Sequence, residues 1–417
     1  MSHGHSVCVL MTMHKIYTLK NGIRLVYEKV ARTQSVSVGI FVKSGSMYET
    51  KKENGISHFI EHMLFKGTQK RSAKQIAEEM DFVGGQINAY TAKDYTCYYT
   101  KVLSEDFPLS VDILSDMYYN SLFKEEDIEL ERGVIIEEIN MYEDSPEDIA
   151  IDSAFENIWK DHPLGHLISG TTESVSKITR DMLLDYMKKR YTPANTVISV
   201  VGNFDENAML DLLETHFPKS APSFEDDWKA PIFHPGIWER KKDIEQAHIA
   251  ITFPGYPLGS PKNRALLLLN SIFGASMSSR LFQKIREENG LCYSIYSFLG
   301  VYPDAGFFGI YAGTNEEDLD RVISLIDNEA DRICSENVTD FELRKAFSQL
   351  RCSVLMGRES LSARMSNYGR ELLLRGRVKT DRKVLSDYEK VTAEDISVCA
   401  NEIFDKNNRG VYILRPL

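Results

Sequence analysis

The chain lacks the sequence features of secreted and membrane-anchored proteins. No run of apolar residues approaches the roughly 18 that a helix needs to cross a bilayer. The amino terminus has neither the basic segment and small-residue cleavage site of a secretory signal nor the Arg-rich amphipathic pattern of a mitochondrial transit peptide. We therefore expect a cytoplasmic protein in which residues 1–14 form a disordered N-terminal extension.

Cysteine is scarce, and its spacing shows no pairing. The six cysteines lie in apolar or helical contexts without any Cys-x-x-Cys pattern: Cys8, Cys97, Cys292, Cys334, Cys352 and Cys399. Such scattered cysteines are typical of reduced thiols in a cytosolic protein.

Basic residues are also fewer than acidic residues. The chain has 49 Lys and Arg against 61 Asp and Glu, and its net charge of −12 is spread along the sequence rather than gathered in a tail. This distribution argues against nucleic acid and membranes as partners. With 43% hydrophobic and 26% charged residues, the 417-residue chain has the composition of an ordinary globular protein, and its length predicts two domains of about 200 residues.

The most informative segment is the apolar stretch from Gly55 to Phe65, which contains two histidines and a glutamate. Residues four apart lie one above the other on an α-helix, so His58 and His62 can present their rings to one metal ion with Glu61 beside them. The order His-x-x-Glu-His is the inverse of the familiar zinc peptidase motif. A buried helix would need separate partners for these three groups, whereas one divalent cation satisfies all of them. The segment therefore predicts a zinc site.

Two histidines leave a catalytic zinc one protein ligand short. The best candidate lies in the charged, Pro-free run from Glu125 to Tyr142, which predicts a long helix with an apolar stripe. Glu131 and Glu138 are seven residues apart, so they share a face, whereas Glu137 is rotated roughly 120° from Glu131. The helix phase favours Glu138 as the ligand if Glu131 also faces the site. A solvated acidic face is the alternative interpretation.

These residues resemble the inverted-motif zinc peptidases, the family that includes pitrilysin, insulin-degrading enzyme and the mitochondrial processing peptidase. The likeness covers nearly the whole chain and is to the two-domain, bacterial-type branch, which resembles the catalytic subunit of the processing peptidase. In that family the third zinc ligand is a glutamate in a helix downstream of the motif, and here Glu138 follows His62 by 76 residues. The family's supporting glutamate, one heptad earlier, matches Glu131.

Two further segments carry the resemblance. The family's Gly-Gly-x-x-Asn-Ala strand recurs at residues 84–91, and in relatives it is the edge strand along which the substrate lies. The resemblance thus implies that Asn88 and Ala89 pair with the substrate backbone. Residues 286–293 resemble the family's Arg/Tyr pair, which reaches the reaction centre from another domain. By this likeness Tyr293 stabilises the tetrahedral oxyanion and Arg286 positions a carbonyl or carboxylate.

The resemblance implies a zinc metalloendopeptidase with one Zn²⁺ per chain, held by His58, His62 and Glu138. Glu61 is then the general base that takes a proton from the zinc-bound water, and Glu131 orients the ligands or shares a proton with Glu61. The expected substrates are extended peptides or unfolded polypeptide segments, cleaved inside a closed chamber. A noncatalytic binding or scaffold subunit of the same fold is the alternative. Such relatives typically lose metal ligands, which this chain retains.

Strands and helices mix in both halves of the sequence, which predicts an α+β fold of two homologous domains, each a mixed, largely antiparallel β-sheet packed with α-helices. We expect a zinc-binding catalytic domain at 15–216, a Pro-rich linker at 217–236 and a homologous metal-free domain carrying the Arg/Tyr pair at 237–417. The helix that corresponds to the metal-binding helix, 262–273, has no His or Glu.

The predicted elements of the first half are a hairpin at Asn21-Gly22, a strand at 35–42, a strand pair within 84–102, a strand at 196–202 and, besides the metal-binding helix, helices at 72–82, 105–120, 125–142, 150–159 and 179–190. Those of the second half are strands at 247–253, within 292–312 and at 409–414, and helices at 262–273, at 279–288 and from residues 315 and 340.

The resemblance also implies an assembly. Larger relatives enclose their site between four such domains, and two copies of this chain supply four. We therefore expect a homodimer in which Arg286 and Tyr293 of one chain complete the zinc site of the other.

Overall fold

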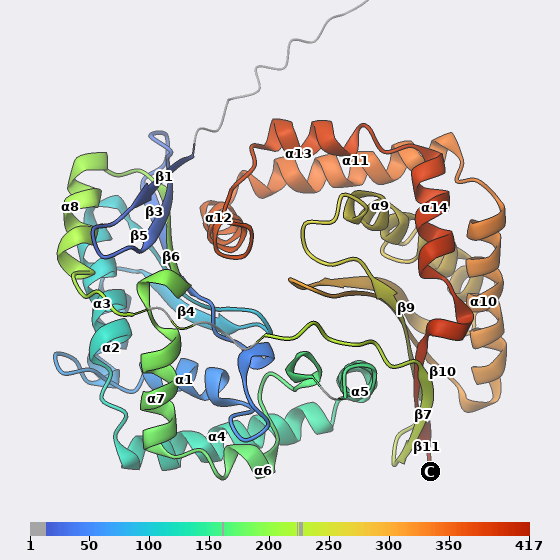
Figure 1. Cartoon of the computed structure of the whole chain (residues 1–417), viewed down its shortest axis with the longest axis horizontal. Helices are drawn as coiled ribbons and strands as arrows, with labels where there is room; N and C mark the ends of the chain where they lie inside the picture. The colour runs from blue at the N-terminus through green and yellow to red at the C-terminus, as the bar shows by residue number, and fades with distance from the viewer. Residues whose placement is uncertain (1–13, 161, 223, 225–227) are drawn as a thin grey trace, which may run out of the picture.

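The computed structural model describes residues 14–160, 162–222, 224 and 228–417. It contains two mixed β-sheets, each packed with helices, one on either side of the molecule (Figure 1). The predicted α+β class is therefore confirmed. The expected N-terminal extension falls, apart from residue 14, outside the described residues.

In the described part of the chain, the first sheet has six strands in the order β1-β2-β6-β3-β5-β4, of which only β2 and β6 run parallel. The predicted hairpin joins β1 to β2, and Gly22 at its turn has a φ of 98°, a conformation that glycine adopts without strain. The strands are β1 Lys15–Thr18, β2 Arg24–Lys29, β3 Ser35–Val42, β4 Gln86–Thr91, β5 Thr96–Leu103 and β6 Thr196–Gly202.

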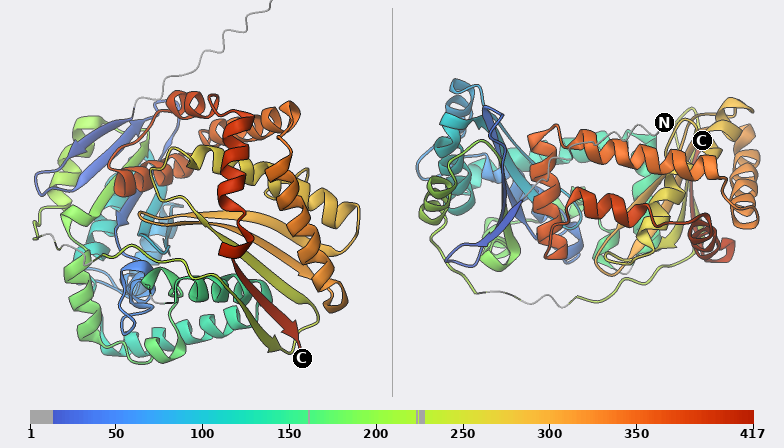
Figure 2. Two further views of the ribbon diagram at one scale, coloured as in Figure 1. Left: turned by 45° about the vertical axis from the view of Figure 1, so that its right-hand side comes forward. Right: turned by 90° about the horizontal axis from the view of Figure 1, so that it is seen from above.

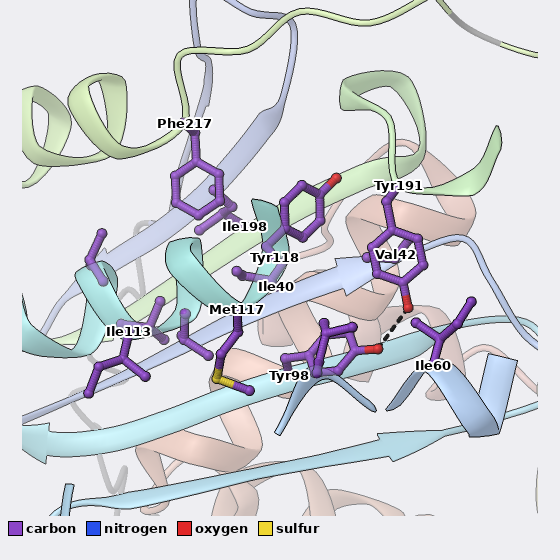
Figure 3. Close-up of a cluster of buried hydrophobic side chains, with 14 of the residues drawn as sticks. Ile40, Val42, Ile60, Tyr98, Ile113, Met117, Tyr118, Tyr191, Ile198 and Phe217 are labelled. Carbon is purple, nitrogen blue, oxygen red and sulfur yellow. Dashed lines mark hydrogen bonds between the residues drawn. The ribbon is translucent and has the colours of Figure 1, made fainter. Parts of the chain in front are cut away.

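The described residues between or after these strands form eight α-helices: α1 Ile56–Leu64, α2 Ala73–Phe82, α3 Phe107–Asn120, α4 Glu125–Glu143, α5 Pro146–Ile158, α6 Thr172–Val175, α7 Arg180–Arg190 and α8 Glu206–His216. The core forms where the aliphatic faces of α1 and α3 meet the buried face of the sheet. Figure 3 shows Ile60 of α1 in this core beside Tyr98 and Tyr191, whose hydroxyls are 2.7 Å apart.

The second sheet, as far as the structure describes it, has five strands in the order β7-β11-β8-β10-β9, and only β7 and β11 run parallel among them. Its strands are β7 Gly236–Lys242, β8 Ala247–Gly255, β9 Cys292–Val301, β10 Gly306–Thr314 and β11 Gly410–Pro416. Its helices are α9 Asn263–Phe273, α10 Leu319–Ser335, α11 Asp340–Gly357, α12 Leu361–Arg375, α13 Asp381–Tyr388 and α14 Ala393–Ile403. The order of elements and the late, central insertion of β11 repeat the first half, in which β6 is inserted in the same way.

Each half covers part of the other half's sheet. Helix α12 packs on β3 and β6 of the first sheet, and α5 packs on β8 and β11 of the second (Figure 1). Gly369 of α12 allows this approach, because a Cβ atom there would lie 2.1 Å from the Phe41 ring of β3. The described residues between α8 and β7 run along one side of the molecule from one half to the other (Figure 2).

Most predicted elements of the first half have the observed bounds within a few residues. The strand at 196–202 is β6 without change, and the helix at 125–142 is α4. The helix predicted from residue 150 begins earlier, at Pro146, because proline is well tolerated in a first turn and Ser145 caps it through the Asp148 amide.

The second half differs more. The helix predicted at 279–288 is a π-helical segment, Phe282–Glu287. The sequence patterns did not indicate α6 and α8 in the first half, or β7, α12, α13 and α14 in the second. No helix in the described part of the chain is long and apolar enough to cross a membrane.

Candidate metal centre

Helix α1 separates an apolar face from a polar one. Ile56, Phe59, Ile60 and Met63 are fully buried against the first sheet and its helices. His58, Glu61 and His62 are only partly buried and lie on the other side of the helix. The packing of the apolar face therefore fixes the direction in which the two imidazoles and the carboxylate point.

Helix α4 brings a second carboxylate to this polar face. Glu138 Oε2 lies 3.6 Å from His58 Nε2 and 3.7 Å from His62 Nε2, and one ligand atom from each of the three residues lies within 4.8 Å of the others. Tetrahedral zinc with bonds of 2.0–2.1 Å holds its ligand atoms about 3.4 Å apart, so this donor set fits zinc. Glu137 is exposed on another face of α4.

The surroundings of His58 keep its ring in the state that binds a metal. Burial, together with the nearby His62, lowers the pKa of His58 to about 4, so the His58 ring is neutral at neutral pH. His62 Nδ1 lies 3.0 Å from Glu131 Oε2. A carboxylate can only accept, so Nδ1 donates this bond, and Nε2 is the ring nitrogen that faces Glu138. Lys66 forms an ion pair with the other oxygen of the buried Glu131.

Glu61 is held by a residue to which the sequence analysis gave no role. Thr91 Oγ1, at the end of β4, donates a 2.5 Å hydrogen bond to Glu61 Oε2. Burial raises the pKa of the Glu61 carboxyl, the Thr91 bond and His62 lower it, and the nearby Glu138 raises it. The net direction is upward, as expected for a carboxylate poised to accept a proton. Residues two apart on a strand lie on the same face, and Thr91 follows Ala89 by two residues. This spacing was the available signal in the sequence that Thr91 faces the same side of β4 as Ala89.

Strand β4 forms one edge of the first sheet, since β5 is its only partner strand in the described part of the chain. Asn88 is exposed, and its Oδ1 accepts a 2.8 Å hydrogen bond from the Ala89 amide. The strand contacts α1 directly. The expected substrate-binding strand thus lies beside the candidate metal ligands, with one edge free to pair with an extended chain.

Arg286 and Tyr293 are not part of this cluster. They lie at the end of the π-helical segment and the start of β9, and α1 and β9 belong to opposite halves of the molecule (Figure 1). The Arg286 guanidinium lies 5.0 Å from the centre of the Tyr293 ring, which is 78% exposed. The chain therefore brings together His58, Glu61, His62, Glu131 and Glu138, and holds the Arg/Tyr pair elsewhere on its surface.

The second half has no equivalent centre in the part that the structure describes. Among the described residues, His58, His62 and Glu138 are the only group of three potential ligands that could hold a metal ion. Helix α9, which corresponds in position to α1, buries an aliphatic face and carries no histidine or carboxylate.

Comparison with known proteins identifies both halves. Residues 24–172 match the family model described as insulinase (peptidase family M16), and residues 177–350 match the model described as the peptidase M16 inactive domain. The chain is 39% identical over 395 residues to the uncharacterized zinc protease YmxG of Bacillus subtilis, covering 95% of this chain and 97% of that protein. It is 36% identical over 411 residues to the uncharacterized zinc protease SCO5738 of Streptomyces coelicolor, covering 96% and 89%.

Two solved structures have the same fold. A protease from Helicobacter pylori has a TM-score of 0.89 at 22% identity, and the match covers 97% of this chain and 100% of that protein. The peptidase M16 inactive domain from Pseudomonas fluorescens has a TM-score of 0.89 at 17% identity, covering 97% and 98%.

Proposed function

This chain belongs to the insulinase family, peptidase family M16, and we propose that it is a zinc metalloendopeptidase that hydrolyses extended peptides or unfolded polypeptide segments. The observation that carries the proposal is the convergence of His58 Nε2, His62 Nε2 and Glu138 Oε2 with Glu61 beside them. His58, His62 and Glu138 hold one zinc ion per chain. Its relatives' description as zinc proteases supports the choice of metal.

Each residue of the cluster has a chemical role in this proposal. When bound, zinc lowers the pKa of its water to about 7 and polarises the scissile carbonyl. Glu61 accepts the proton of that water and delivers it to the leaving amine, because its carboxylate is adjacent to the ligands without being one of them. Glu131 fixes the His62 ring through Nδ1, and Thr91 fixes the Glu61 carboxylate.

The edge of β4 suits an extended substrate. We propose that the substrate backbone adds as a further strand along Asn88 and Ala89, a mode that reads extension more than sequence. The small side chain of Ala89 leaves room for this approach. Folded proteins present few extended segments of this kind, which restricts the substrates to peptides and unfolded regions.

The assembly and location are further parts of the proposal. Arg286 and Tyr293 serve the zinc site of a second copy in a homodimer, and the two chains enclose the chamber. Residues 15–216 act as the catalytic domain, 237–417 as the metal-free domain and 217–236 as their linker. The protein works in the cytoplasm, in keeping with cysteines that are scattered along the sequence without a Cys-x-x-Cys pattern.

The test combines metal analysis with hydrolysis. Purified protein is expected to contain zinc and to cleave an internally quenched peptide, and a chelator should abolish cleavage until zinc is restored. A protein that binds peptides and zinc without cleaving them would support the alternative of a noncatalytic binding subunit. Cleavage that survives complete removal of the metal would exclude the proposed mechanism.

A further inference from the structure

Helix α12 has an apolar face and a polar face. Its apolar side chains Leu361, Met365 and Leu372 are buried, and this face packs on the first sheet. The other face repeats polar residues three and four apart, a spacing that places side chains one above the other on a helix. These residues are Arg364, Asn367, Glu371 and Arg375. None of them belongs to the metal centre or to β4.

The polar face of α12 lines a cavity of about 410 Å³, together with the start of α9, the end of α11 and part of α13. We call it the basic cavity, because six basic side chains line it: Arg264, Arg358, Arg364, Arg375, Arg377 and Lys379. The acidic residues in its lining are Glu371, Asp381 and Asp387. In a chain with a net charge of −12, this is a local reversal of sign.

One carboxylate at the basic cavity is shared by three cations. Asp387 Oδ2 accepts hydrogen bonds from Arg264 at 3.2 Å and from Lys379 at 3.0 Å, and its Oδ1 accepts one from Lys383 at 2.7 Å. Glu28 of β2 is shared in the same way by two arginines of the lining. A single negative charge cannot neutralise several cations, so these contacts leave an excess of positive charge.

The other acidic groups do not remove this excess. Glu371 pairs with Arg375 at 2.9 Å, and Asp381 pairs with Arg358. No carboxylate in the described part of the chain forms an ion pair with Arg377, which is exposed and lines the basic cavity. With Glu28 and Lys383 included, seven cations face four carboxylates.

This excess of arginine and lysine suits an anionic ligand. Arginine presents N–H donors in a planar fork that matches the oxygens of a carboxylate or phosphate, and a cleft with one sign of charge concentrates counter-ions. We propose that the basic cavity binds a small anion that carries several phosphoryl or carboxylate oxygens. Its volume is within the range of small-molecule sites and admits a molecule such as pyrophosphate or citrate. This inference goes beyond the proposed function and requires neither zinc nor peptide hydrolysis.

Calorimetric titration of the full chain with pyrophosphate, and separately with citrate, tests the proposal at constant ionic strength. At least one of the two anions should bind with a Kd below about 1 mM. Both anions also chelate zinc, so the titrations are repeated on metal-free protein, and only binding common to both forms is assigned to the basic cavity. Binding of pyrophosphate alone would identify a phosphoryl ligand, and binding of citrate alone a carboxylate ligand.

Two arginine variants locate the binding. Arg377→Gln removes a charge without breaking an ion pair of the described chain, and it should raise the Kd at least about threefold. Adding Arg375→Gln should bring the increase to at least about tenfold. Arg382→Gln is the matched control, because Arg382 is exposed on α13 and is not among the described residues of the lining. It removes the same charge and should change the Kd by less than about twofold.

Melting temperatures without added anion verify that each variant is folded. Failure of the folded wild type to bind either anion would overturn the proposal. Equal affinities of the wild type and Arg377→Gln would overturn it as well, because the anion would then bind elsewhere. If the double variant does not fold, Arg377→Gln decides alone.

Discussion

At the scale of single residues, burial and partners distinguish three carboxylates that look alike in sequence. Glu138 is half-buried and faces both histidines, and Glu131 is buried between His62 and Lys66. Glu61 faces a threonine hydroxyl. In the proposed function, the same type of side chain therefore has three roles: Glu138 binds the metal, Glu131 orients a ligand and Glu61 accepts a proton. Variants at these positions should therefore fail in different ways.

The role of Glu61 predicts a loss of turnover without a loss of metal. Glu61→Gln preserves the size of the side chain and cannot accept a proton from water, so kcat should fall by at least ~10²-fold. Zinc content and melting temperature should match the wild type. Near-normal turnover in this variant would remove Glu61 from the role of general base.

The identity of the third ligand predicts a contrast between neighbours on α4. Glu138→Gln should lower zinc occupancy strongly, because a neutral amide is a poor zinc ligand and its Oε2 is the atom facing both histidines. Glu137→Gln is the control, since Glu137 points to solvent. Occupancy can be measured by atomic absorption after dialysis. Equal occupancy in both variants would show that the ligand lies elsewhere.

The hydrogen bond from Thr91 predicts a change in pH dependence. This bond lowers the pKa of Glu61, so Thr91→Val should raise that pKa. A general base works only when deprotonated, and the acid limb of the kcat/KM profile should therefore move to higher pH. Thr91→Ser keeps the donor and should keep the wild-type profile. Superimposable profiles for wild type and Thr91→Val would show that the bond does not act on the base.

At the scale of helices and strands, two glycines in helices predict opposite effects on stability. Gly133 lies in α4 with open space around its missing Cβ, so Gly133→Ala should raise the free energy of unfolding by about 1 kcal/mol through helix propensity alone. Gly369 in α12 lies against Phe41, and Gly369→Ala should lower it by about 1–3 kcal/mol through overpacking.

The melting temperatures of both variants, measured by calorimetry, test these two predictions. A higher melting temperature for Gly133→Ala and a lower one for Gly369→Ala is the expected result. If Gly369→Ala is as stable as the wild type, α12 does not pack closely on the first sheet as the structure has it.

The elements that the sequence predicted are those with a strong local signal. The apolar run of β6, the periodicity of α4 and the Asn-Gly turn between β1 and β2 each follow from a few neighbouring residues. Residues 361–403 gave no such motif, and α12, α13 and α14 were missed. Helix α12 in particular is specified by the sheet of the other half, which no local pattern reports.

The residues of the candidate site also divide into those that local sequence spacing predicts and those that it does not. The spacing of His58, Glu61 and His62 on one helix, and of Glu131 and Glu138 on another, is readable because helix geometry converts spacing into direction. Thr91 depends on a tertiary contact between separate segments, because its hydroxyl on β4 meets Glu61 on α1. Its role could not be predicted without the fold.

At the scale of the whole molecule, the exchange of α5 and α12 joins two similar halves into one unit with a single candidate metal cluster in its described residues. Arg286 and Tyr293 lie in the second half, and the Tyr293 ring is largely exposed. A bulky aromatic side chain exposed in this way has room for contact with another molecule. In the proposed two-fold homodimer, each pair serves the zinc site of the other chain.

This arrangement predicts that two inactive variants restore activity when mixed. Glu61→Gln removes the base of one site, and Tyr293→Phe removes the hydroxyl expected to stabilise the oxyanion of the partner's site. A mixed dimer holds one site with both groups intact, because the Glu61→Gln chain supplies a normal Tyr293 to the metal site of the Tyr293→Phe chain. Activity should therefore reappear as subunits exchange, up to about a quarter of the wild-type value when equal amounts mix at random. Exchange can be followed independently by energy transfer between differently labelled chains. If exchange is complete and no activity returns, each site is built from one chain, and Tyr293 acts within its own molecule or not at all.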